Sequence, residues 1–294
     1  MVRSMFSAIA GLKSHQTRMD VIGNNIANVN TWGYKSQSIN FTDTLYQTMK
    51  NGKGGDGNAA GGTGGINASQ LGFGVDVGSI SMNHTGGSWS LTGRANELMI
   101  NGPAFFVVGS NQNPGTAIDG KITAADGLML SRVGILSKDN EGYLVDDSGN
   151  YVYGFGVDQN GKPNTNLQRI KCKTAADEDY TSISFAQDGT ISGVTADGKT
   201  ERIGMLAVAN VSNANGLEKS EGYYYNIGEN AGDVTVMQTT AMTGQILSGY
   251  LEMSNTNLAD EMANMIITQR GYQANTKMIT VTDQMLEELV NMKR

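Results

Sequence analysis

Apolar side chains recur every seven residues at both ends of the chain. The N-terminal row is Met5, Leu12, Met19 and Ile26, flanked by Ile9 and Ile22. The C-terminal row is Leu251, Leu258, Met265, Tyr272, Ile279 and Leu286, beside a second row of Met278, Met285 and Met292. A sustained seven-residue repeat is typical of a helix that supercoils around another helix. The pattern predicts two long terminal helices paired as a coiled coil, rather than amphipathic helices lying on a core of their own.

Between these ends the apolar period changes from seven to two. "SISFAQDGTISGVTADGK" alternates around Asp188-Gly189 and Asp197-Gly198, which are turn dipeptides flanked by strand-like runs. "GYLVDDSGNYVYGFGVDQNGK" alternates around Ser148-Gly149 and Asn160-Gly161, and "ELMINGPAFFVV" places Asn101-Gly102-Pro103 between two apolar runs. Many short strands with closely spaced turn signals predict an antiparallel β-rich domain, so the fold class is α+β.

These patterns divide the chain into four predicted regions. Residues 1–32 form the N-terminal helix, and 33–75 form an extended, glycine-rich linking segment that includes "NGKGGDGNAAGGTGG" at 51–65. Residues 76–240 form the β-rich domain, and 241–294 form a second linking segment and the C-terminal helix.

Asparagine is concentrated at the end of the first helix, in "VIGNNIANVNTWGYK" at 21–35. Asn is a poor helix former that prefers caps and turns. We expect the helix to stop at Thr31-Trp32-Gly33. One hypothesis is that Asn24, Asn25 and Asn28 hydrogen-bond to helices of neighbouring subunits and set their register, as a polar coiled-coil position can. The alternative is that they only keep the monomer soluble.

Composition excludes several classes of protein. With a formal net charge of −7, the chain is not expected to bind nucleic acid. Its single cysteine, Cys172, excludes an intramolecular disulfide. No apolar run approaches the length of roughly 18 residues that a membrane span requires, so no transmembrane helix is expected. Lys13 interrupts the N-terminal apolar stretch, so no signal peptide is predicted either, and these rules alone would place the protein in the cytoplasm.

Candidate chemistry is sparse. The two histidines, His15 in a predicted helix and His84 in a predicted strand, have no Cys partner and form no His pair, so a zinc site or catalytic triad is not expected. The runs "DNEG", "DDSG" and "DQNG" do not match a calcium-binding loop and are better explained as turns between strands. "GFGVDVG" lacks the spacing of a dinucleotide-binding loop. We predict no enzyme, no catalytic or metal-binding residue and no cofactor.

Two long motifs at opposite ends carry a resemblance to a known family. "SMFSAIAGLKSHQTRMDVIGNNIANVNTWGYK" resembles the N-terminal motif of the bacterial flagellar rod and hook proteins. "LEMSNTNLADEMANMIITQRGYQANTKMITVTDQMLEELVNMK" resembles their C-terminal motif, including a Ser-Asn pair. "LTGRANELMINGPAFFVV" and "SRVGILSKDNEGYLVDDSGNYVYG", with its Arg-x-Gly sequence, are similar to segments from the middle of these proteins.

Within the family the details resemble hook proteins. "QRGYQANTK" reads like a hook sequence, whereas distal rod proteins tend towards an Ala-Tyr-Glu version of that motif. The length leaves room for only one β-domain, although many hook proteins carry an extra one. Trp32 also departs from the family habit, because a small or polar residue usually lies between the Thr and the Gly.

The resemblance implies a subunit that self-assembles into a helical tube. The paired terminal helices would line its inner core, with the β-domain outside. The expected location is the hook or basal body of the flagellum, extracellular, after export without a cleaved signal peptide. Expected partners are the rod and hook–filament junction proteins, the hook cap and the export apparatus, with no membrane insertion. The predicted interface residues of the inner core are Met5, Ile9, Leu12, Met19, Ile22, Asn24, Asn25, Ile26, Asn28, Leu251, Leu258, Met265, Gln269, Arg270, Tyr272, Asn275, Ile279 and Leu286.

The predicted function is therefore a structural hook subunit that acts as a universal joint and transmits motor torque to the filament. The close alternative is the distal rod protein of the basal body. A third interpretation is a secreted, β-rich, adhesin-like module whose helices pair within one monomer. A hydrolase using Asp146 or Asp147 is the remaining hypothesis.

Overall fold

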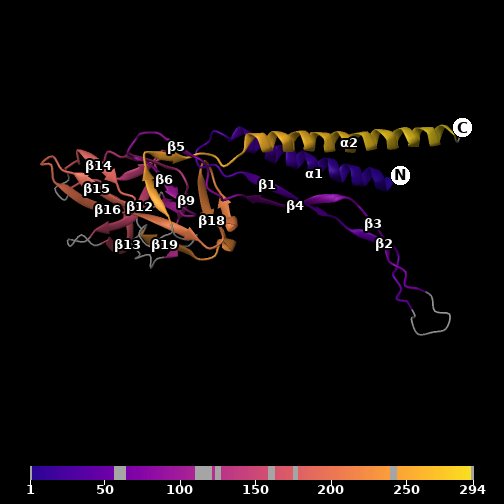
Figure 1. The fold of residues 1–294 in the computed structure, drawn as a ribbon, viewed down its shortest axis with the longest axis horizontal. Coiled ribbons are helices and arrows are strands. Elements are labelled where there is room, and N and C mark those ends of the chain that lie inside the picture. Colours follow the sequence, from indigo (N-terminus) through magenta and orange to yellow (C-terminus); the bar gives the residue numbers. More distant parts are fainter. Residues whose placement is uncertain are drawn as a thin grey trace. The chain divides into compact units, whose positions relative to one another are not determined.

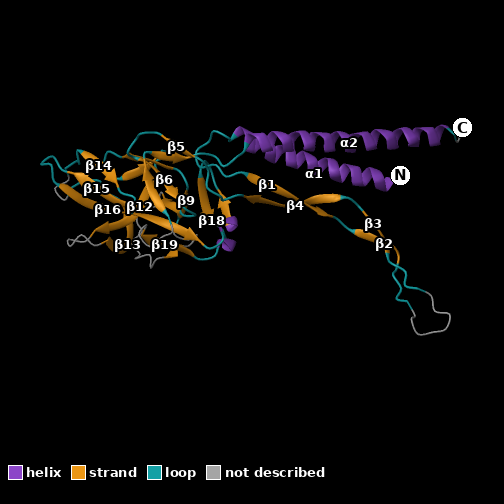
Figure 2. Ribbon diagram, in the orientation of Figure 1, coloured by secondary structure: helices purple, strands orange, loops and turns teal. Residues whose placement is uncertain are grey.

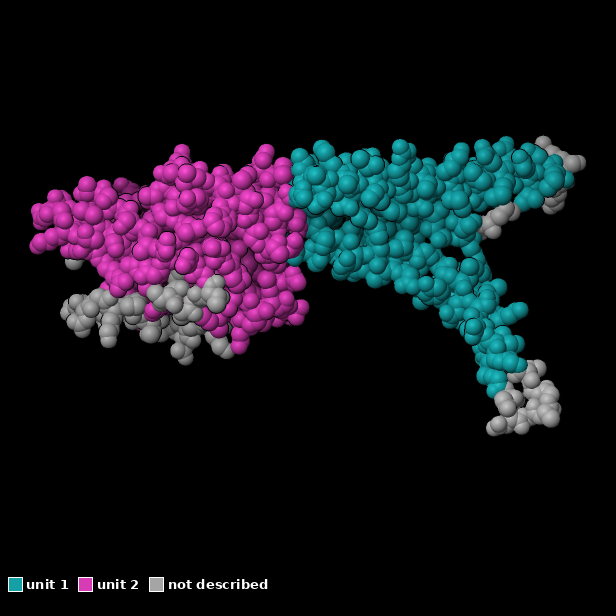
Figure 3. Space-filling model, in the orientation of Figure 1, with its two compact units in different colours: residues 1–27, 37–82, 257–294 teal, residues 28–36, 83–256 magenta. Residues whose placement is uncertain are grey.

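The computed structural model describes residues 2–55, 64–109, 121–122, 127–157, 163–174, 178–238 and 244–292. The chain divides into two compact units, coloured separately in Figure 3. Unit 1 comprises residues 1–27, 37–82 and 257–294, and unit 2 comprises residues 28–36 and 83–256. The chain therefore passes between the units four times. The Asn160-Gly161 turn and most of the glycine-rich segment lie outside the described residues.

Unit 1 contains both long helices, α1 (Val2–Ala27) and α2 (Leu258–Asn291) (Figures 1 and 2). α1 ends at Ala27, earlier than predicted, because the chain already turns at Asn28, whose carbonyl accepts a bond from the Thr31 N–H. α2 begins at Leu258 because the Asn257 side chain caps it by accepting a bond from the Ala259 N–H. Leu251, the first member of the predicted C-terminal row, is therefore not helical and lies in a strand.

The rest of unit 1 is made of two β-ribbons. β1 (Gln37–Asp43) pairs antiparallel with β4 (Val75–Met82), and β2 (Tyr46–Lys50) pairs antiparallel with β3 (Ser69–Gly72). Residues that were expected to form an extended link thus form strands. The β1–β4 ribbon packs on α1, where the Ser14 hydroxyl donates to the Val75 carbonyl at 3.3 Å.

Unit 2 is the β-rich unit. Its strands are β5 (Trp89–Leu91), β6 (Glu97–Asn101), β7 (Phe105–Gly109), β8 (Lys121–Ile122), β9 (Leu128–Ser131), β10 (Gly134–Lys138), β11 (Leu144–Asp146), β12 (Tyr151–Val157), β13 (Pro163–Arg169), β14 (Ser182–Phe185), β15 (Thr190–Val194), β16 (Thr200–Val211), β17 (Leu217–Lys219), β18 (Tyr224–Ile227), β19 (Val234–Gln238), β20 (Gln245–Ser248) and β21 (Tyr250–Glu252). Two short 3-10 helices, η2 (Ala214–Gly216) and η3 (Glu229–Ala231), lie between strands. The main sheet has the order β17-β18-β9-β7-β16-β12-β11-β10-β6-β20, and β21 pairs with β5. The α+β fold class is confirmed.

The predicted turns join neighbouring strands of this unit. Asp188-Gly189 connects β14 to β15, and Asp197-Gly198 connects β15 to β16. Both glycines have a φ of +78°, the left-handed conformation that this turn chemistry requires. Asn101-Gly102-Pro103 lies between β6 and β7, and Ser148-Gly149 lies between β11 and β12. These local predictions are confirmed because each depends on two or three adjacent residues.

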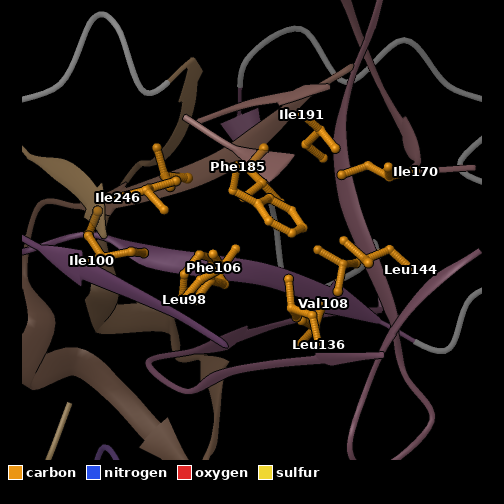
Figure 4. Close-up of a cluster of buried hydrophobic side chains, with 14 of the residues drawn as sticks. Leu98, Ile100, Phe106, Val108, Leu136, Leu144, Ile170, Phe185, Ile191 and Ile246 are labelled. Atoms are coloured by element: carbon orange, nitrogen blue, oxygen red, sulfur yellow. The ribbon is translucent and has the colours of Figure 1, made fainter. Parts of the chain in front are cut away.

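The core of unit 2 is apolar and closely packed. Figure 4 shows side chains from β6, β7, β10, β14, β15 and β20 converging on one volume, with Phe106 and Phe185 near its middle. Leu98, Leu206 and Ile191 are fully buried there. Because many short strands contribute one or two apolar side chains each, the sheet encloses its core within a single chain.

Candidate functional site

The facing sides of α1 and α2 are largely polar. The Asn25 amide donates to Glu261 Oε1 at 3.0 Å, and Arg18 reaches Asn264 Oδ1 at 3.5 Å. Further along, a Cβ on Gly11 would lie 2.8 Å from the Asn275 amide nitrogen. Higher numbers on α1 meet lower numbers on α2, so the helices run antiparallel.

Two parallel rows on α2 explain this polar contact. The predicted apolar row of Met265, Tyr272, Ile279 and Leu286 is partly buried. Beside it, at the same seven-residue spacing, runs a row of Glu261, Thr268, Asn275 and Thr282. Thr268 and Thr282 are buried, and their hydroxyls donate to the Asn264 and Met278 carbonyls, both at 2.7 Å. A hydropathy pattern alone does not register this second row, because its members are polar.

Asn25 has a specific role within the chain. Its side chain is 1% exposed. Its amide donates to the Gln37 carbonyl at 2.8 Å as well as to Glu261, and its Oδ1 accepts from the Gln37 N–H at 2.9 Å. Asn25 thus joins α1, β1 and α2 of one subunit. Its amide hydrogens are already used inside the molecule, and a role for Asn25 in register between subunits stays a prediction.

The other asparagines of that segment lie in different surroundings. Asn24 is exposed on α1. Asn28 belongs to unit 2, is half-buried, and accepts a bond from the Thr31 hydroxyl at 3.1 Å. A register role for Asn24 and Asn28 between subunits stays a prediction.

The remaining predicted interface residues differ widely in burial. Ile22 and Leu251 are buried; Met5, Leu12, Met19 and Ile26 are half-buried; and Ile9, Leu258, Gln269 and Arg270 are exposed. Within unit 1, α2 also exposes large apolar side chains that α1 does not cover, with Ile266 59% and Met278 52% exposed. The exposed apolar surface of α2 consists of Leu258, Met262, Ile266, Ile267, Met278, Val281, Met285, Leu289 and Val290, together with the C-cap residue Met292.

A second site, in unit 2, was not predicted from the sequence. Glu252, the last residue of β21, has a side chain that is 1% exposed. Its Oε1 lies 2.7 Å from Lys35 Nζ and its Oε2 lies 3.1 Å from Arg132 Nε. Its Oε1 also accepts the Gly87 N–H at 2.9 Å. One buried carboxylate therefore pairs with two buried cations.

Both cations also donate to backbone carbonyls. Lys35 Nζ donates to Thr85 at 2.7 Å, and Arg132 Nη1 donates to Gly102 at 2.7 Å and to Ala104. Burial alone would raise the pKa of Glu252, but Arg132 and Lys35 lower this pKa below its ordinary value. Removing one partner of such a pair leaves an uncompensated buried charge, which typically costs about 3–5 kcal/mol.

Asn255 makes a second set of contacts nearby. Its Oδ1 accepts the Ser36 N–H at 2.7 Å, and its amide donates to the Asn83 carbonyl at 2.8 Å and the Thr85 carbonyl at 3.2 Å. Together with Glu252 it joins residues 33–36, 83–87 and 252–255. We call Lys35, Arg132, Glu252 and Asn255 the junction cluster.

A sequence signal for the junction cluster does exist. Lys35 ends the N-terminal motif, Arg132 begins the Arg-x-Gly sequence, and Glu252 and Asn255 lie in the C-terminal motif. Each of these residues belongs to a motif that carries the family resemblance. Their meeting was not predictable because Lys35 and Glu252 are separated by 217 positions.

Asp146, a residue of the hydrolase hypothesis, is explained by local structure. It is 1% exposed and accepts bonds from the Tyr223 and Tyr224 hydroxyls at 3.3 and 2.9 Å. Burial raises the pKa of Asp146, while these bonds and the Asp147 N–H act in the opposite direction. Among the described residues, no group of three His, Cys, Asp or Glu side chains is placed to hold a metal ion. In that same part of the chain, neither helix is long and apolar enough to cross a membrane.

Comparison with known proteins decides the family. A "Flagella basal body rod protein" sequence model matches residues 5–35, and a "Flagellar basal body rod FlgEFG protein C-terminal" model matches residues 247–292. The flagellar basal-body rod protein FlgG of Bacillus subtilis is 38% identical over 297 residues, with all of both chains covered. The chain belongs to the flagellar rod and hook protein family.

Other relatives include both rod and hook proteins. The FlgG rod protein of Buchnera aphidicola subsp. Acyrthosiphon pisum is 34% identical, covering 98% of this chain and 99% of its own. The flagellar hook protein FlgE of Borreliella burgdorferi is 26% identical over 447 aligned residues, with all of both chains covered. The two family models contain Lys35, Glu252 and Asn255, so the junction cluster draws on both terminal motifs of this rod and hook family chain.

Proposed function

We propose that this chain is a structural subunit of the flagellar hook. It polymerises with other copies into a flexible tube that passes motor torque to the filament. α1 and α2 form a coiled coil in the inner core of this tube, and unit 2 lies outside it. The observation that carries the proposal is the exposed apolar surface of α2, because so many large apolar side chains on a long helix mark a protein–protein contact.

The lengths of the helices support the same proposal. α1 has 26 residues and α2 has 34. Asn25 contacts Glu261 and Gly11 lies against Asn275, so the two contacts are equally far apart along both helices. At this register Val2 falls opposite Gln284. The last turns of α2, with Leu289 44% and Val290 68% exposed, then extend beyond α1 and are available to another copy.

The position along the flagellar axis has two candidates. We place the chain in the hook because Gln273-Ala274-Asn275 resembles the hook form of the C-terminal motif. The distal rod is the second candidate, since the FlgG rod protein of Bacillus subtilis has the higher identity and aligns over 297 residues, against 447 for the Borreliella hook protein.

The proposal also covers export and partners. The subunit leaves the cell through the flagellar export apparatus without a cleaved signal peptide. It then meets the rod proteins, the hook–filament junction proteins and the hook cap. We propose no catalytic activity and no cofactor.

Imaging of the assembled flagellum tests the location. An epitope tag inserted at Asp197-Gly198 would lie in the exposed β15–β16 turn of unit 2. Immunogold label along the curved segment outside the envelope supports the hook, and label restricted to the straight shaft inside the envelope supports the rod. Absence of label from the flagellum in a motile tagged strain would overturn the proposal and favour an adhesin-like module.

A pair of substitutions tests assembly itself. Met285→Gln makes the apolar surface of α2 more polar, whereas Glu287→Gln changes an exposed charge on the same helix. We expect Met285→Gln to reduce polymerisation, measured by sedimentation, while Glu287→Gln leaves it close to the unmodified protein. Equal polymerisation of both variants would exclude this surface as an interface.

A further inference from the structure

The chain passes between the two units four times. Force therefore enters or leaves unit 2 at three segments, the first of which adjoins unit 1 at both of its ends. These are residues 28–36, 83–88 and 252–256. In a subunit that transmits torque, each segment carries tension between the helices and the sheet. Three short segments pulled separately would peel away one at a time, so a joint that holds them together is mechanically significant.

Glu252 connects all three segments through one carboxylate. It belongs to the third segment, pairs with Lys35 of the first at 2.7 Å, and accepts the Gly87 N–H of the second at 2.9 Å. Its other oxygen pairs with Arg132 at 3.1 Å. Arg132 is anchored in turn to the Gly102 carbonyl of the β6–β7 turn. The segments are thus tied to one another and to the main sheet.

Asn255 repeats this arrangement three residues later. It binds the first segment at the Ser36 N–H and the second at the Asn83 and Thr85 carbonyls. The segments also touch directly. The Gly33 N–H donates to the Glu252 carbonyl at 2.8 Å, and the Met253 N–H donates to the Ser88 carbonyl at 2.8 Å. A Cβ on Gly87 would come within 2.0 Å of the Met253 carbonyl oxygen, so the second and third segments are in backbone contact.

We propose that the junction cluster is a mechanical clamp, in which Glu252 and Asn255 bind the three segments into one body so that torque enters unit 2 through all of them together. The clamp rests on the proposed function for its role in torque, but its structural part concerns one chain alone. It lies at the chain crossings and is held by charge and hydrogen bonds, unlike the apolar core, which it adjoins where Arg132 donates to the Ala104 carbonyl. It therefore opens without unfolding the sheet when Glu252 loses its charge.

Trypsin measures clamp opening directly, because it cleaves after lysine and Lys35 is 1% exposed. The peptide bond between Lys35 and Ser36 is cut only when the first segment detaches. Cys172 is 0% exposed in the core, so its reaction with a thiol reagent reports opening of the sheet. The ratio of these two rates in the purified full chain separates local from global opening.

Glu252→Gln is the decisive variant, and Glu97→Gln is its matched control. Glu97 is also buried, but its charged partner Arg94 is 80% exposed and it lies outside the junction cluster. We expect Glu252→Gln to raise cleavage after Lys35 by about two orders of magnitude, since a buried pair loses one partner. In the same variant, the rate of Cys172 modification should rise by a factor about ten times smaller than the rate of cleavage. Glu97→Gln should change neither rate by more than about twofold.

Two results would overturn the clamp. The first is unchanged cleavage after Lys35 in Glu252→Gln, and the second is cleavage that rises in strict parallel with Cys172 reactivity. If Glu252→Gln does not fold, Asn255→Ala answers the same question, because it removes the bonds to Ser36, Asn83 and Thr85 without leaving a buried charge. In Asn255→Ala, the rate of cleavage after Lys35 must then rise by a factor at least about three times larger than the rate of Cys172 modification.

The role in torque is tested in cells that carry the tagged chain. Flagella built from Asn255→Ala subunits should form in normal number but be shed several times more often in viscous medium than those built from Glu97→Gln subunits. Equal shedding would overturn the mechanical role while leaving the trypsin result intact. A tagged chain absent from the flagellum would refute the proposed function instead, so the two failures are distinguishable.

Discussion

The two units distribute their apolar side chains in opposite ways. In unit 2, Phe106 and Leu206 are at most 1% exposed, and the buried charged groups described above are either ion-paired or, like Asp146, hydrogen-bonded. In unit 1, Thr268 and Asn25 are buried while Ile266 is 59% exposed. Unit 2 buries its hydrophobic side chains within one chain, as independent domains do. Unit 1 buries polar side chains beside apolar ones such as Val21 and Ile22, and leaves a large apolar surface of α2 exposed, which suits an element completed by other copies.

Truncation of an apolar side chain in each unit should give the largest contrast. Phe106→Ala in unit 2 should lower the free energy of unfolding by about 3–5 kcal/mol, because it leaves a cavity in a packed core. Ile266→Ala in unit 1 should change the free energy of unfolding of the monomer by less than about 0.5 kcal/mol. Urea unfolding followed by circular dichroism measures both. A loss above about 2 kcal/mol for Ile266→Ala, which is typical of a buried isoleucine, would mean that this side chain is covered within the monomer.

Buried polar groups of unit 1 provide the next contrast. Asn25→Ala removes three hydrogen bonds and leaves the Gln37 backbone groups without their side-chain partner, so we expect a loss of about 1–3 kcal/mol. Asn24→Ala, at an exposed neighbouring position, should stay within about 0.5 kcal/mol. Thermal unfolding followed by the far-ultraviolet circular dichroism of the helices compares the two variants. Similar losses for both would show that the Asn25 contacts contribute nothing specific.

The two histidines should differ in their effect on unit 2 as the pH falls. Burial, then Lys35 and Arg132, lower the pKa of His84 from its ordinary value of 6.5. The unfolded chain therefore binds the proton more readily, so stability is complete above about pH 6.5 and decreases as pH falls towards the folded pKa. The slope cannot exceed about 1.4 kcal/mol per pH unit for one proton. Urea unfolding at several pH values, with Cys172 reactivity as the readout, measures this slope.

His15 supplies the control for that experiment. Burial and Arg18 also lower the pKa of His15, but this residue packs against Phe41 of unit 1. His84→Gln should flatten the pH dependence seen at Cys172, and His15→Gln should leave it unchanged. The opposite pattern would show that the titration of unit 2 originates elsewhere.

The smallest expected effect comes from glycines of α1. Gly23 has no neighbouring atom within 4 Å of an added Cβ, so Gly23→Ala should stabilise the helix by about 0.5–1 kcal/mol. At Gly11 an added Cβ would lie 2.8 Å from the Asn275 amide nitrogen, so the helical gain is offset by displacement of that side chain. Thermal unfolding of both variants measures the difference. Equal gains would show that the α1–α2 contact is looser than the structure has it.

Features that depend on adjacent residues were predictable. The turns at Asp188-Gly189 and Asp197-Gly198 follow from the backbone conformation that glycine allows, and the two helices follow from their apolar repeats. The ends of the helices were less well predicted. Asn28 turns the chain before Thr31, and the apolar row that began at Leu251 gave no sign that Asn257 would cap the helix.

The sequence by itself determined the α+β class, the family and the local turns, because neighbouring residues carry that information. Only the tertiary structure decided which polar side chains meet. Asn25 reaches Glu261 across 236 positions, and Lys35 reaches Glu252 across 217. Burial makes such contacts strong, since an unpaired polar group in the interior destabilises the fold. The conformational preferences of neighbouring residues, however, do not specify which distant side chain will be the partner. The buried polar contacts of unit 1 and the junction cluster of unit 2 therefore became visible only in three dimensions.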